Sequence, residues 1–310
     1  NKNKNKNKNK NKTNNNNNNN TKKKGRIFVG TSGYSYQHWR GSFYPRGLPA
    51  TGEFDHYARH FSAVELNSTF YGVPQASVFD QWRERAPRVS CTGGFTYVVK
   101  ANQFFTHQKQ IHVDETFASR WHDFWASCQR LGASLGCVLF QLPPKFRLTK
   151  VPDAPAEGPG QATLERLKHL GRLLPSEGRF AFEFRDPSWF GDPDVLAVFR
   201  RFNWCLCLVS CCNEDGWAGQ MASGCSPELE KYIPTCNWGV YARFHGPSGQ
   251  YVGSYGRRQL RKFARSLQKG VSGSSRCIFA FFNNTDDGLP LPSATVDAHV
   301  LHEELAKLQG

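Results

Sequence analysis

The chain has 310 residues, of which 39% are hydrophobic and 14% aromatic, so most of it can form a globular core. Its formal net charge of +15 is concentrated at one end, since residues 1–24 carry nine lysines and no acid. The other residues, 31 basic and 25 acidic, give only a weak signal for nucleic-acid binding. No stretch approaches the roughly 20 apolar residues of a transmembrane helix. The sequence therefore predicts a cytoplasmic protein without a membrane partner.

Residues 1–24 are an alternation of lysine and asparagine followed by an asparagine run. They include no apolar side chain, so they can bury nothing, and we expect a disordered tail that the rest of the chain does not need for folding. The same composition lacks the apolar segment of a signal peptide. We therefore expect one folded domain over residues 25–310.

From Gly25 onward, short apolar runs alternate with amphipathic helical patterns. The predicted strands are Arg26–Gly30, Ala63–Asn67, Phe95–Lys100, Cys137–Gln141, Phe180–Arg185, Trp204–Val209, Gly239–His245 and Cys277–Phe282. The predicted helices are Glu53–Phe61, Gln75–Arg85, Asp114–Leu131, Ala162–Leu174, Pro193–Phe202, Arg257–Gln268 and Ala294–Leu308. Eight such units predict an α/β fold, a single-domain (β/α)₈ TIM barrel. The alternative, a doubly wound open sheet, has a glycine fingerprint after its first strand, which this chain lacks.

Ten cysteines are present, but no pair has the CxxC spacing of a zinc ribbon or a redox site. Cys205 and Cys207 alternate with Leu206 and Leu208, a pattern typical of a buried strand. We interpret these cysteines as core residues and expect no disulfide framework.

Polar side chains gather at the carboxyl ends of the predicted strands. In Phe180–Arg185 the phenylalanines share one face, while Ala181, Glu183 and Arg185 share the other. The other strand ends supply Glu65, Asn67, Lys100, Gln141, Tyr241, Arg243, His245, Asn283 and Asn284. Charged groups facing the inside of a barrel are costly to desolvate, which predicts a functional cavity at these ends. The alternative is a network of ion pairs that plugs the barrel.

Glu65 and Glu183 are the carboxylates that share the inward face of the strand ends, and both are candidates for a general acid and base. Arg185 lies two residues after Glu183 and favours a permanently ionised carboxylate there, whereas Glu65 has no nearby base. We therefore expect Glu65 to be the proton shuttle, with His107 and His245 as alternatives. On this view Glu183→Gln destabilises the cavity and Glu65→Gln leaves the fold intact.

The remaining polar and aromatic residues of these ends suit an anionic ligand. The predicted binding residues are Asn67, Tyr71, Lys100, Gln141, Arg185, Trp189, Arg243, Ser248, Asn283 and Asn284. In barrels of this kind a phosphate often sits in the loops after strands seven and eight, where Arg243 could bind it through two hydrogen bonds. The alternative is that Arg243 neutralises Glu183. Because the basic residues would repel a dication, we expect neither a metal nor another cofactor.

Several motifs resemble one family. They are Thr31-Ser32-Gly33-Tyr34-Ser35-Tyr36, Val64-Glu65-Leu66-Asn67-Ser68-Thr69-Phe70-Tyr71, Lys100-Ala101 with Thr106-His107, Gln141-Leu142-Pro143-Pro144, Glu183-Phe184-Arg185 with Ser188-Trp189, Arg243-Phe244-His245-Gly246 and Phe282-Asn283-Asn284. Together they resemble the YecE-like family, also known as domain of unknown function 72, from about Ile27 to Leu308. The resemblance implies a TIM barrel. It implies no particular reaction, because the activity of the family is not established.

Three functional hypotheses remain open. The favoured one is an enzyme, a hydrolase, lyase or isomerase, that performs acid–base chemistry on a small anionic or sugar-phosphate substrate. The second is a nucleic-acid-binding or nuclease-like protein, whose basic rim contacts phosphates. The third is a barrel that binds a metabolite or a partner without catalysis.

Overall fold

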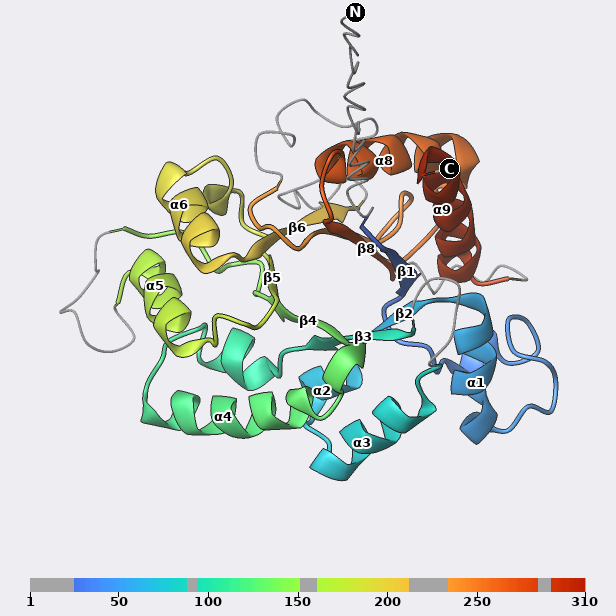
Figure 1. Ribbon diagram of the computed structural model, residues 1–310, viewed down its shortest axis with the longest axis horizontal. Coiled ribbons are helices and arrows are strands. Elements are labelled where there is room, and N and C mark those ends of the chain that lie inside the picture. Colours follow the sequence, from blue (N-terminus) through green and yellow to red (C-terminus); the bar gives the residue numbers. More distant parts are fainter. Residues whose placement is uncertain (1–24, 88–93, 151–160, 212–233, 284–290, 310) are drawn as a thin grey trace, which may run out of the picture.

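The computed structural model describes residues 25–87, 94–150, 161–211, 234–283 and 291–309. Eight parallel strands form one sheet in the order β1-β8-β7-β6-β5-β4-β3-β2, and helices surround it (Figure 1). The strands are β1 (Ile27–Thr31), β2 (Ala63–Leu66), β3 (Thr96–Lys100), β4 (Leu135–Gln141), β5 (Phe180–Glu183), β6 (Cys205–Ser210), β7 (Gly239–Phe244) and β8 (Cys277–Phe282). The predicted TIM barrel and all eight predicted strands are confirmed.

The seven predicted helices are also present, each within a few residues of the expected bounds. The helices are α1 (Ala50–His60), α2 (Ser68–Tyr71), α3 (Ala76–Arg85), α4 (Glu115–Gln129), α5 (Thr163–Leu173), α6 (Pro193–Phe202), α8 (Gly256–Val271) and α9 (Ser293–Gln309). Asp114 caps α4 by accepting from the backbone N–H of Phe117 at 2.8 Å, and Asp192 caps α6 in the same way. The periodicity did not predict the single turn α2 or the π-helical turn η2 (Phe104–Gln108), because each is too short to show a period.

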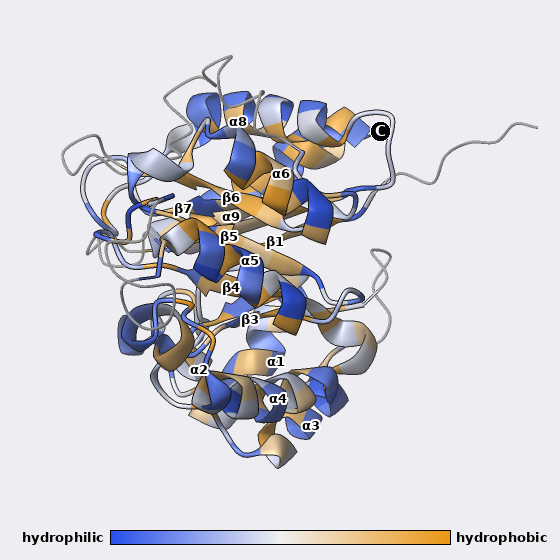
Figure 2. Ribbon diagram, turned by 90° about the vertical axis from the view of Figure 1, so that its left-hand side faces the viewer, coloured by the Kyte–Doolittle hydropathy of each residue, from blue (hydrophilic) through white to orange (hydrophobic). Residues whose placement is uncertain are grey.

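The strand side chains divide by parity into two hydrophobic clusters. On β5, Phe180 and Phe182 pack outward with the helices, whereas Ala181 faces the barrel interior. The interior cluster consists of Phe28, Ala63, Val98, Cys137, Leu139, Ala181, Cys205, Cys207, Val209, Cys236, Trp238, Tyr241, Phe279 and Phe281. Figure 2 shows that the strands are largely hydrophobic, while the surrounding helices carry hydrophilic residues. Cys205 and Cys207 are thus confirmed as buried core residues with free thiols.

The barrel closes between β1 and β2 through an unusual contact. Ser32, directly after β1, forms an isolated bridge with Glu65 of β2, and no continuous ladder joins these two strands in the described residues. The hydroxyl of Tyr57, on α1, fills the gap: it accepts from the N–H of Thr31 at 2.8 Å and donates to the carbonyl of Ala63 at 3.0 Å. A Cβ at Gly30 would lie 2.7 Å from this hydroxyl and 1.9 Å from the Ala63 carbonyl oxygen, so glycine is required there.

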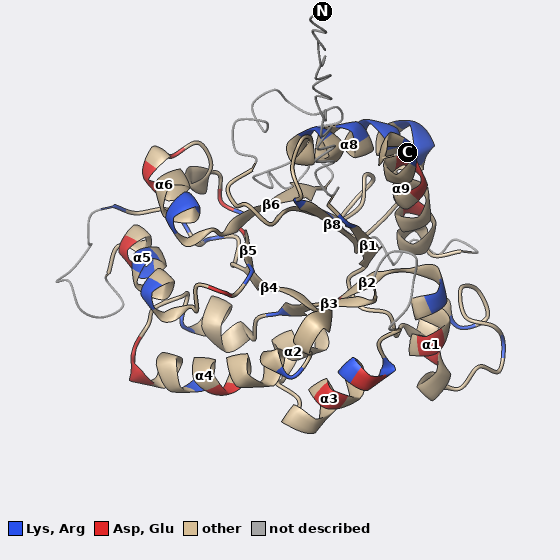
Figure 3. Cartoon of the chain, in the orientation of Figure 1, with Lys and Arg blue, Asp and Glu red and all other residues tan. Residues whose placement is uncertain are grey.

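Many of the charged residues lie on the outer helices (Figure 3). Lysines and arginines follow one face of α8, and Arg257 and Arg261 of this helix form ion pairs with Glu304 of the adjacent α9, each at 2.8 Å. No helix in the described ranges is long and apolar enough to cross a membrane. The predicted disordered tail, residues 1–24, lies outside the described residues.

Candidate functional site

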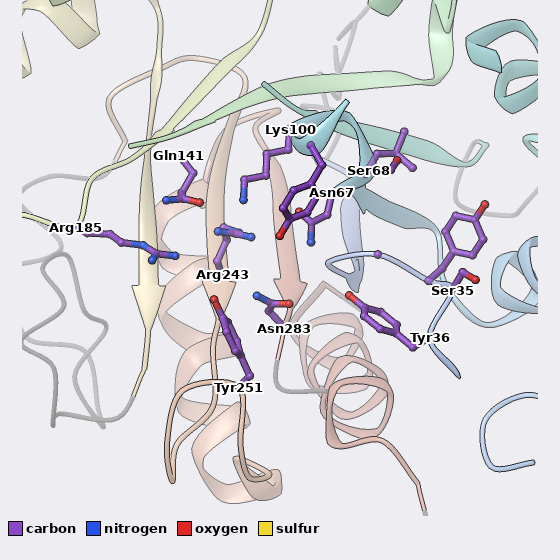
Figure 4. Close-up of a pocket in the computed structure, with 14 residues that line it drawn as sticks. Ser35, Tyr36, Asn67, Ser68, Lys100, Gln141, Arg185, Arg243, Tyr251 and Asn283 are labelled. Atoms are coloured by element: carbon purple, nitrogen blue, oxygen red, sulfur yellow. The ribbon is translucent and has the colours of Figure 1, made fainter. Parts of the chain in front are cut away.

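A cavity of about 530 Å³ opens at the carboxyl ends of the strands (Figure 4). Lys100 and Gln141 are the last residues of β3 and β4, Asn67 and Asn283 directly follow β2 and β8, and Arg185 lies just beyond β5. The full lining is Gly33, Tyr34, Ser35, Tyr36, Leu66, Asn67, Ser68, Tyr71, Lys100, Gln141, Arg185, Arg243, Tyr251 and Asn283. Among these described residues the charged side chains are two arginines and a lysine, without a carboxylate.

At the base of the cavity, four charged side chains of alternating sign form a continuous chain, in which the two arginines line the cavity and the two glutamates lie below them. Arg185 Nε donates to Glu183 Oε1 at 3.0 Å, and Arg243 Nη1 donates to Glu183 Oε2 at 2.5 Å. Arg243 Nη2 then donates to Glu65 Oε1 at 2.6 Å. Both carboxylates are completely buried, and the side chain of Arg243 is only 2% exposed. Such buried ions are stable only when each is paired, which this chain achieves.

Glu65 is further fixed by two hydroxyl groups. Tyr241 donates to its Oε2 at 2.6 Å, and Ser32 donates to its Oε1 at 2.7 Å. The expectation that Glu65 has no basic neighbour is therefore wrong, because Arg243 reaches it from β7. Both glutamates bind arginine, so the predicted contrast between a paired Glu183 and an unpaired Glu65 is also wrong.

His245, next to Glu183, is held as a neutral imidazole. Burial lowers the pKa of His245 to about 4, despite the opposing effect of the Glu183 carboxylate, whose Oε2 lies 3.8 Å from Nε2. Burial would raise the pKa of Glu183, but Arg243, Arg185 and His245 outweigh it and hold that pKa well below its ordinary value. Glu183 is thus an ionised group of the barrel interior, unsuited to giving up and regaining a proton near neutral pH.

Lys100 differs from the two arginines of the cavity. Within the described part of the chain, no carboxylate lies within ion-pair distance of its ammonium, which contacts the Phe70 ring with Nζ 4.2 Å from the centroid. Burial, reinforced by the charge of Arg243, lowers the pKa of Lys100 to about 8. Lys100 therefore exists in both protonation states near neutral pH.

The short helix α2 is fixed over the end of β3 and brings Phe70 to Lys100. Thr69 donates to the carbonyl of Lys100 at 2.6 Å, and the amide of Asn102 donates to the carbonyls of Thr69 and Phe70, both at 3.0 Å. At the start of this helix, Asn67 lines the cavity, and its buried Oδ1 has no hydrogen-bond partner among the described atoms. An unpartnered buried oxygen is costly, which is expected where a ligand completes the bonding.

Two loops close the opposite side. The carboxylate of Glu53, on α1, holds the loop after β1 by accepting from Ser35 Oγ at 2.6 Å and Arg40 Nε at 2.8 Å. In the loop after β7, Tyr251 has a φ of 68°, which is unfavourable for a residue with a Cβ. Its ring nevertheless lies in the cavity wall (Figure 4). Strain of this kind commonly occurs at functional sites.

The structure brings together most of the predicted binding residues. Those that line the cavity are Asn67, Tyr71, Lys100, Gln141, Arg185, Arg243 and Asn283. Asn284 lies outside the described residues. Ser248 is exposed in the loop after β7 and does not line the cavity, and Arg243 binds the carboxylates, which was the alternative to its role as an anion ligand.

Trp189 was predicted as a binding residue, but the structure buries it. Its ring stacks on Phe184 with centroids 4.2 Å apart, and its Nε1 donates to the carbonyl of Phe146 at 2.6 Å. The four candidate acid–base residues, Glu65, Glu183, His107 and His245, are not among the residues that line the cavity. His107 is half-buried beside Phe70, and burial together with Lys100 and Arg185 lowers its pKa.

The sequence reasoning missed Ser35, Tyr36, Ser68 and Tyr251 as cavity residues. Ser35 and Tyr36 lie in the loop after β1, and Ser68 begins α2 after β2, so their position close to strand ends was an available signal. Tyr251 had no such signal, because a loop of six residues separates it from the end of β7. Among the described residues, no group of three or more His, Cys, Asp or Glu side chains is placed to hold a metal ion.

Comparisons with known proteins agree with this architecture. The sequence model of the family described as "Protein of unknown function DUF72" matches residues 28–309. The UPF0759 protein YunF of Bacillus subtilis is 26% identical over 283 residues, covering 84% of this chain and 90% of that protein. The UPF0759 protein YecE of Escherichia coli K12 is 28% identical over 176 residues, covering 56% and 54%.

Two crystal structures have the same fold. A DUF72 family protein from Thermotoga maritima MSB8 superimposes with a TM-score of 0.68 at 22% identity, covering 91% of this chain and 99% of that one. A DUF72 family protein from Enterococcus faecalis V583 gives a TM-score of 0.68 at 18% identity, with coverages of 90% and 95%. Since the family match extends over nearly the whole barrel, the chain belongs to the DUF72 (UPF0759, YecE-like) family.

Proposed function

We propose that the protein is an enzyme that binds a small anionic metabolite, such as a phosphorylated or carboxylated compound, in the cavity at the strand ends. One observation carries the proposal: the charged groups among the described cavity residues are all cations. A carboxylate or phosphate entering this space would meet Arg185, whose side chain is 12% exposed, and the ammonium of Lys100. A volume of about 530 Å³ suits a small molecule.

The reactive group of this proposal is Lys100. Acid–base chemistry requires a group that can both hold and release a proton near the working pH. With a pKa of about 8, Lys100 meets this requirement, whereas Glu183 and His245 are held in single protonation states. In this proposal Lys100, which lines the cavity, takes the proton-transfer role that the sequence suggested for Glu65.

Thermal unfolding with added phosphate tests the anion site. Inorganic phosphate should raise the Tm of the wild type relative to chloride at equal ionic strength. Arg185→Gln should weaken the phosphate affinity at least tenfold, or about 1.4 kcal/mol. Ser248→Ala is the matched control, since Ser248 belongs to the loop after β7 without lining the cavity.

An equal response of wild type and Arg185→Gln, or no response of either, would contradict the proposal. A single-stranded oligonucleotide that binds more tightly than phosphate, with an affinity that falls steeply with salt, would instead favour the nucleic-acid hypothesis.

A further inference from the structure

Lys100 bears the one surplus charge of the site. In the group formed by the cavity cations and the buried glutamates, Arg243 is bonded to Glu65 and Glu183, and Arg185 is bonded to Glu183. Three cations thus face two carboxylates. The two arginines share both carboxylates, so the ammonium of Lys100 is left with the Phe70 ring as its contact in the described structure.

A surplus cation in a buried site has two ways to lower its energy. It can attract an anion, or it can lose its proton and become a neutral amine. The arginines cannot take the second way, because a guanidinium stays protonated in proteins. Lys100 can, and burial with the neighbouring charge of Arg243 favours the neutral form, so that its pKa is about 8. Lys100 therefore loses its proton much closer to neutral pH than an ordinary lysine does.

We propose that Lys100 is a nucleophile that forms an imine with the carbonyl carbon of an anionic aldehyde or ketone. This inference rests on the proposed function and names its substrate class. A neutral amine at the wall of a cavity is the arrangement that covalent catalysis by lysine requires.

The chemistry is balanced without an oxidant or a reductant. The lone pair of Nζ adds to the carbonyl carbon, and a proton moves from nitrogen to oxygen to give a carbinolamine. The hydroxyl then leaves with the second Nζ proton as water, and a C=N bond remains. One amine and one carbonyl therefore give one imine and one water.

Three features of the cavity suit these steps. The unpartnered Oδ1 of Asn67 can accept from the carbinolamine hydroxyl. The Phe70 ring, 4.2 Å from Nζ, stabilises the positive charge of a protonated imine as it does that of the ammonium. Arg185 lies across the cavity from Asn67, with Lys100 between them (Figure 4), so an anionic group can be held at one side while the carbonyl reaches the amine.

A simpler role for Lys100 would be electrostatic, as a permanent positive charge that attracts the anion. Both roles predict that removal of Lys100 harms binding. The two roles predict different results for Lys100→Arg, because arginine keeps the positive charge but cannot form an imine. They also differ in the labelling of the wild type by carbonyl compounds, which an electrostatic lysine would not accelerate.

The experiment uses pyridoxal 5′-phosphate, which carries both an aldehyde and a phosphate, and 5′-deoxypyridoxal, which carries the aldehyde without a phosphate and cannot close to a cyclic hemiacetal. Each is incubated with the full chain, trapped with borohydride, and located by peptide mass spectrometry. We expect the fastest adduct at Lys100, formed at least tenfold faster than those at Lys109 and Lys168 in the same digest. Those two lysines are ion-paired to Asp114 and Glu165 and serve as internal references.

The 5′-deoxypyridoxal probe should label Lys100 more slowly than pyridoxal 5′-phosphate, and inorganic phosphate should compete with the phosphorylated probe. Lys100→Arg should lose the fast adduct while phosphate still raises its Tm, and Lys168→Arg should behave as the wild type. Labelling of Lys100 no faster than of the reference lysines would overturn the imine. If phosphate still raises the wild-type Tm, the proposed anion site survives that failure. Fast labelling that phosphate does not slow would support the nucleophile and overturn the anion site.

Discussion

Arg243 and Glu65, 178 residues apart in the chain, are joined by a hydrogen bond of 2.6 Å in the middle of the barrel. They come from β7 and β2, which are not neighbours in the sheet. Because the second terminal nitrogen of Arg243 binds Glu183, this one guanidinium links three strands. The floor of the cavity is therefore a charge-balanced layer of ion pairs, and its two arginines, Arg185 and Arg243, also line the cavity.

The first prediction is that Glu65→Gln and Glu183→Gln both destabilise the fold. Each substitution leaves the buried Arg243 with one carboxylate fewer, and breaking a buried pair typically costs about 3–5 kcal/mol. Urea unfolding measures the loss. Glu303→Gln, which removes an exposed ion pair with Arg257 on the outer helices, is the control and should change stability very little.

The change in unfolding free energy at acidic pH tests the ion pairing of Glu183 independently. The pKa of Glu183 is lower in the folded than in the unfolded chain, so its contribution is present above its ordinary pKa of 4.5 and is lost as the pH falls below it. The difference in unfolding free energy between wild type and Glu183→Gln should shrink over that range. A difference that stays constant would refute the low pKa.

The second prediction concerns Lys100 at alkaline pH. Its pKa falls from 10.5 in the unfolded chain to about 8 in the fold, so the unfolded state binds more protons between these values. Stability should therefore rise with pH through this window, relative to Lys100→Met, by a few kcal/mol. Unfolding free energies at pH 7 to 11 measure it. If the two proteins have parallel profiles, the pKa of Lys100 is not shifted.

The third prediction concerns the seam between β1 and β2. Tyr57→Phe removes the hydroxyl that satisfies both the N–H of Thr31 and the carbonyl of Ala63, and each buried unsatisfied group costs about 1–3 kcal/mol. Tyr97→Phe, which loses one bond to a helix carbonyl, is the control and should cost less. Hydrogen exchange of the Thr31 amide should also accelerate in Tyr57→Phe alone. Equal exchange in both variants would show that Tyr57 does not close the seam.

The fourth prediction separates backbone strain from ligand contact at Tyr251. Tyr251→Gly and Tyr251→Ala both remove the ring from the cavity wall and should weaken the phosphate response equally. Glycine adopts the φ of 68° without a steric penalty, so Tyr251→Gly should be more stable than Tyr251→Ala by about 1 kcal/mol. Thermal unfolding with and without phosphate gives both quantities. Equal stabilities would mean that the loop relaxes when the ring is absent.

The sequence predicted the barrel well because parity and strand ends are local properties. The two-residue period placed Ala181 and Glu183 inward and Phe180 outward without knowledge of their partners, and the structure agrees. The carboxyl ends of parallel strands meet at one edge, so the residues there could be grouped before the fold was known.

What the sequence could not show depends on distant partners and on backbone conformation. By its position after a strand end, Trp189 resembles a ligand-binding residue. The carbonyl of Phe146, 43 residues away, instead fixes its ring in the core. The reach of Arg243 to Glu65 across the barrel has no local signature. The lowered pKa of Lys100 is also a collective effect of burial and neighbouring charge, which no single stretch of sequence contains.

The closure of the barrel also has a consequence for synthesis. β1 pairs over five residues with β8, the last of the described strands to be made, and Ser32, directly after β1, forms a single bridge to β2. On the ribosome, the first strand must therefore wait for its main partner until nearly the whole barrel has emerged. Until then Tyr57 can hold β1 against β2, so that a small N-terminal unit shields one edge of an apolar strand from aggregation.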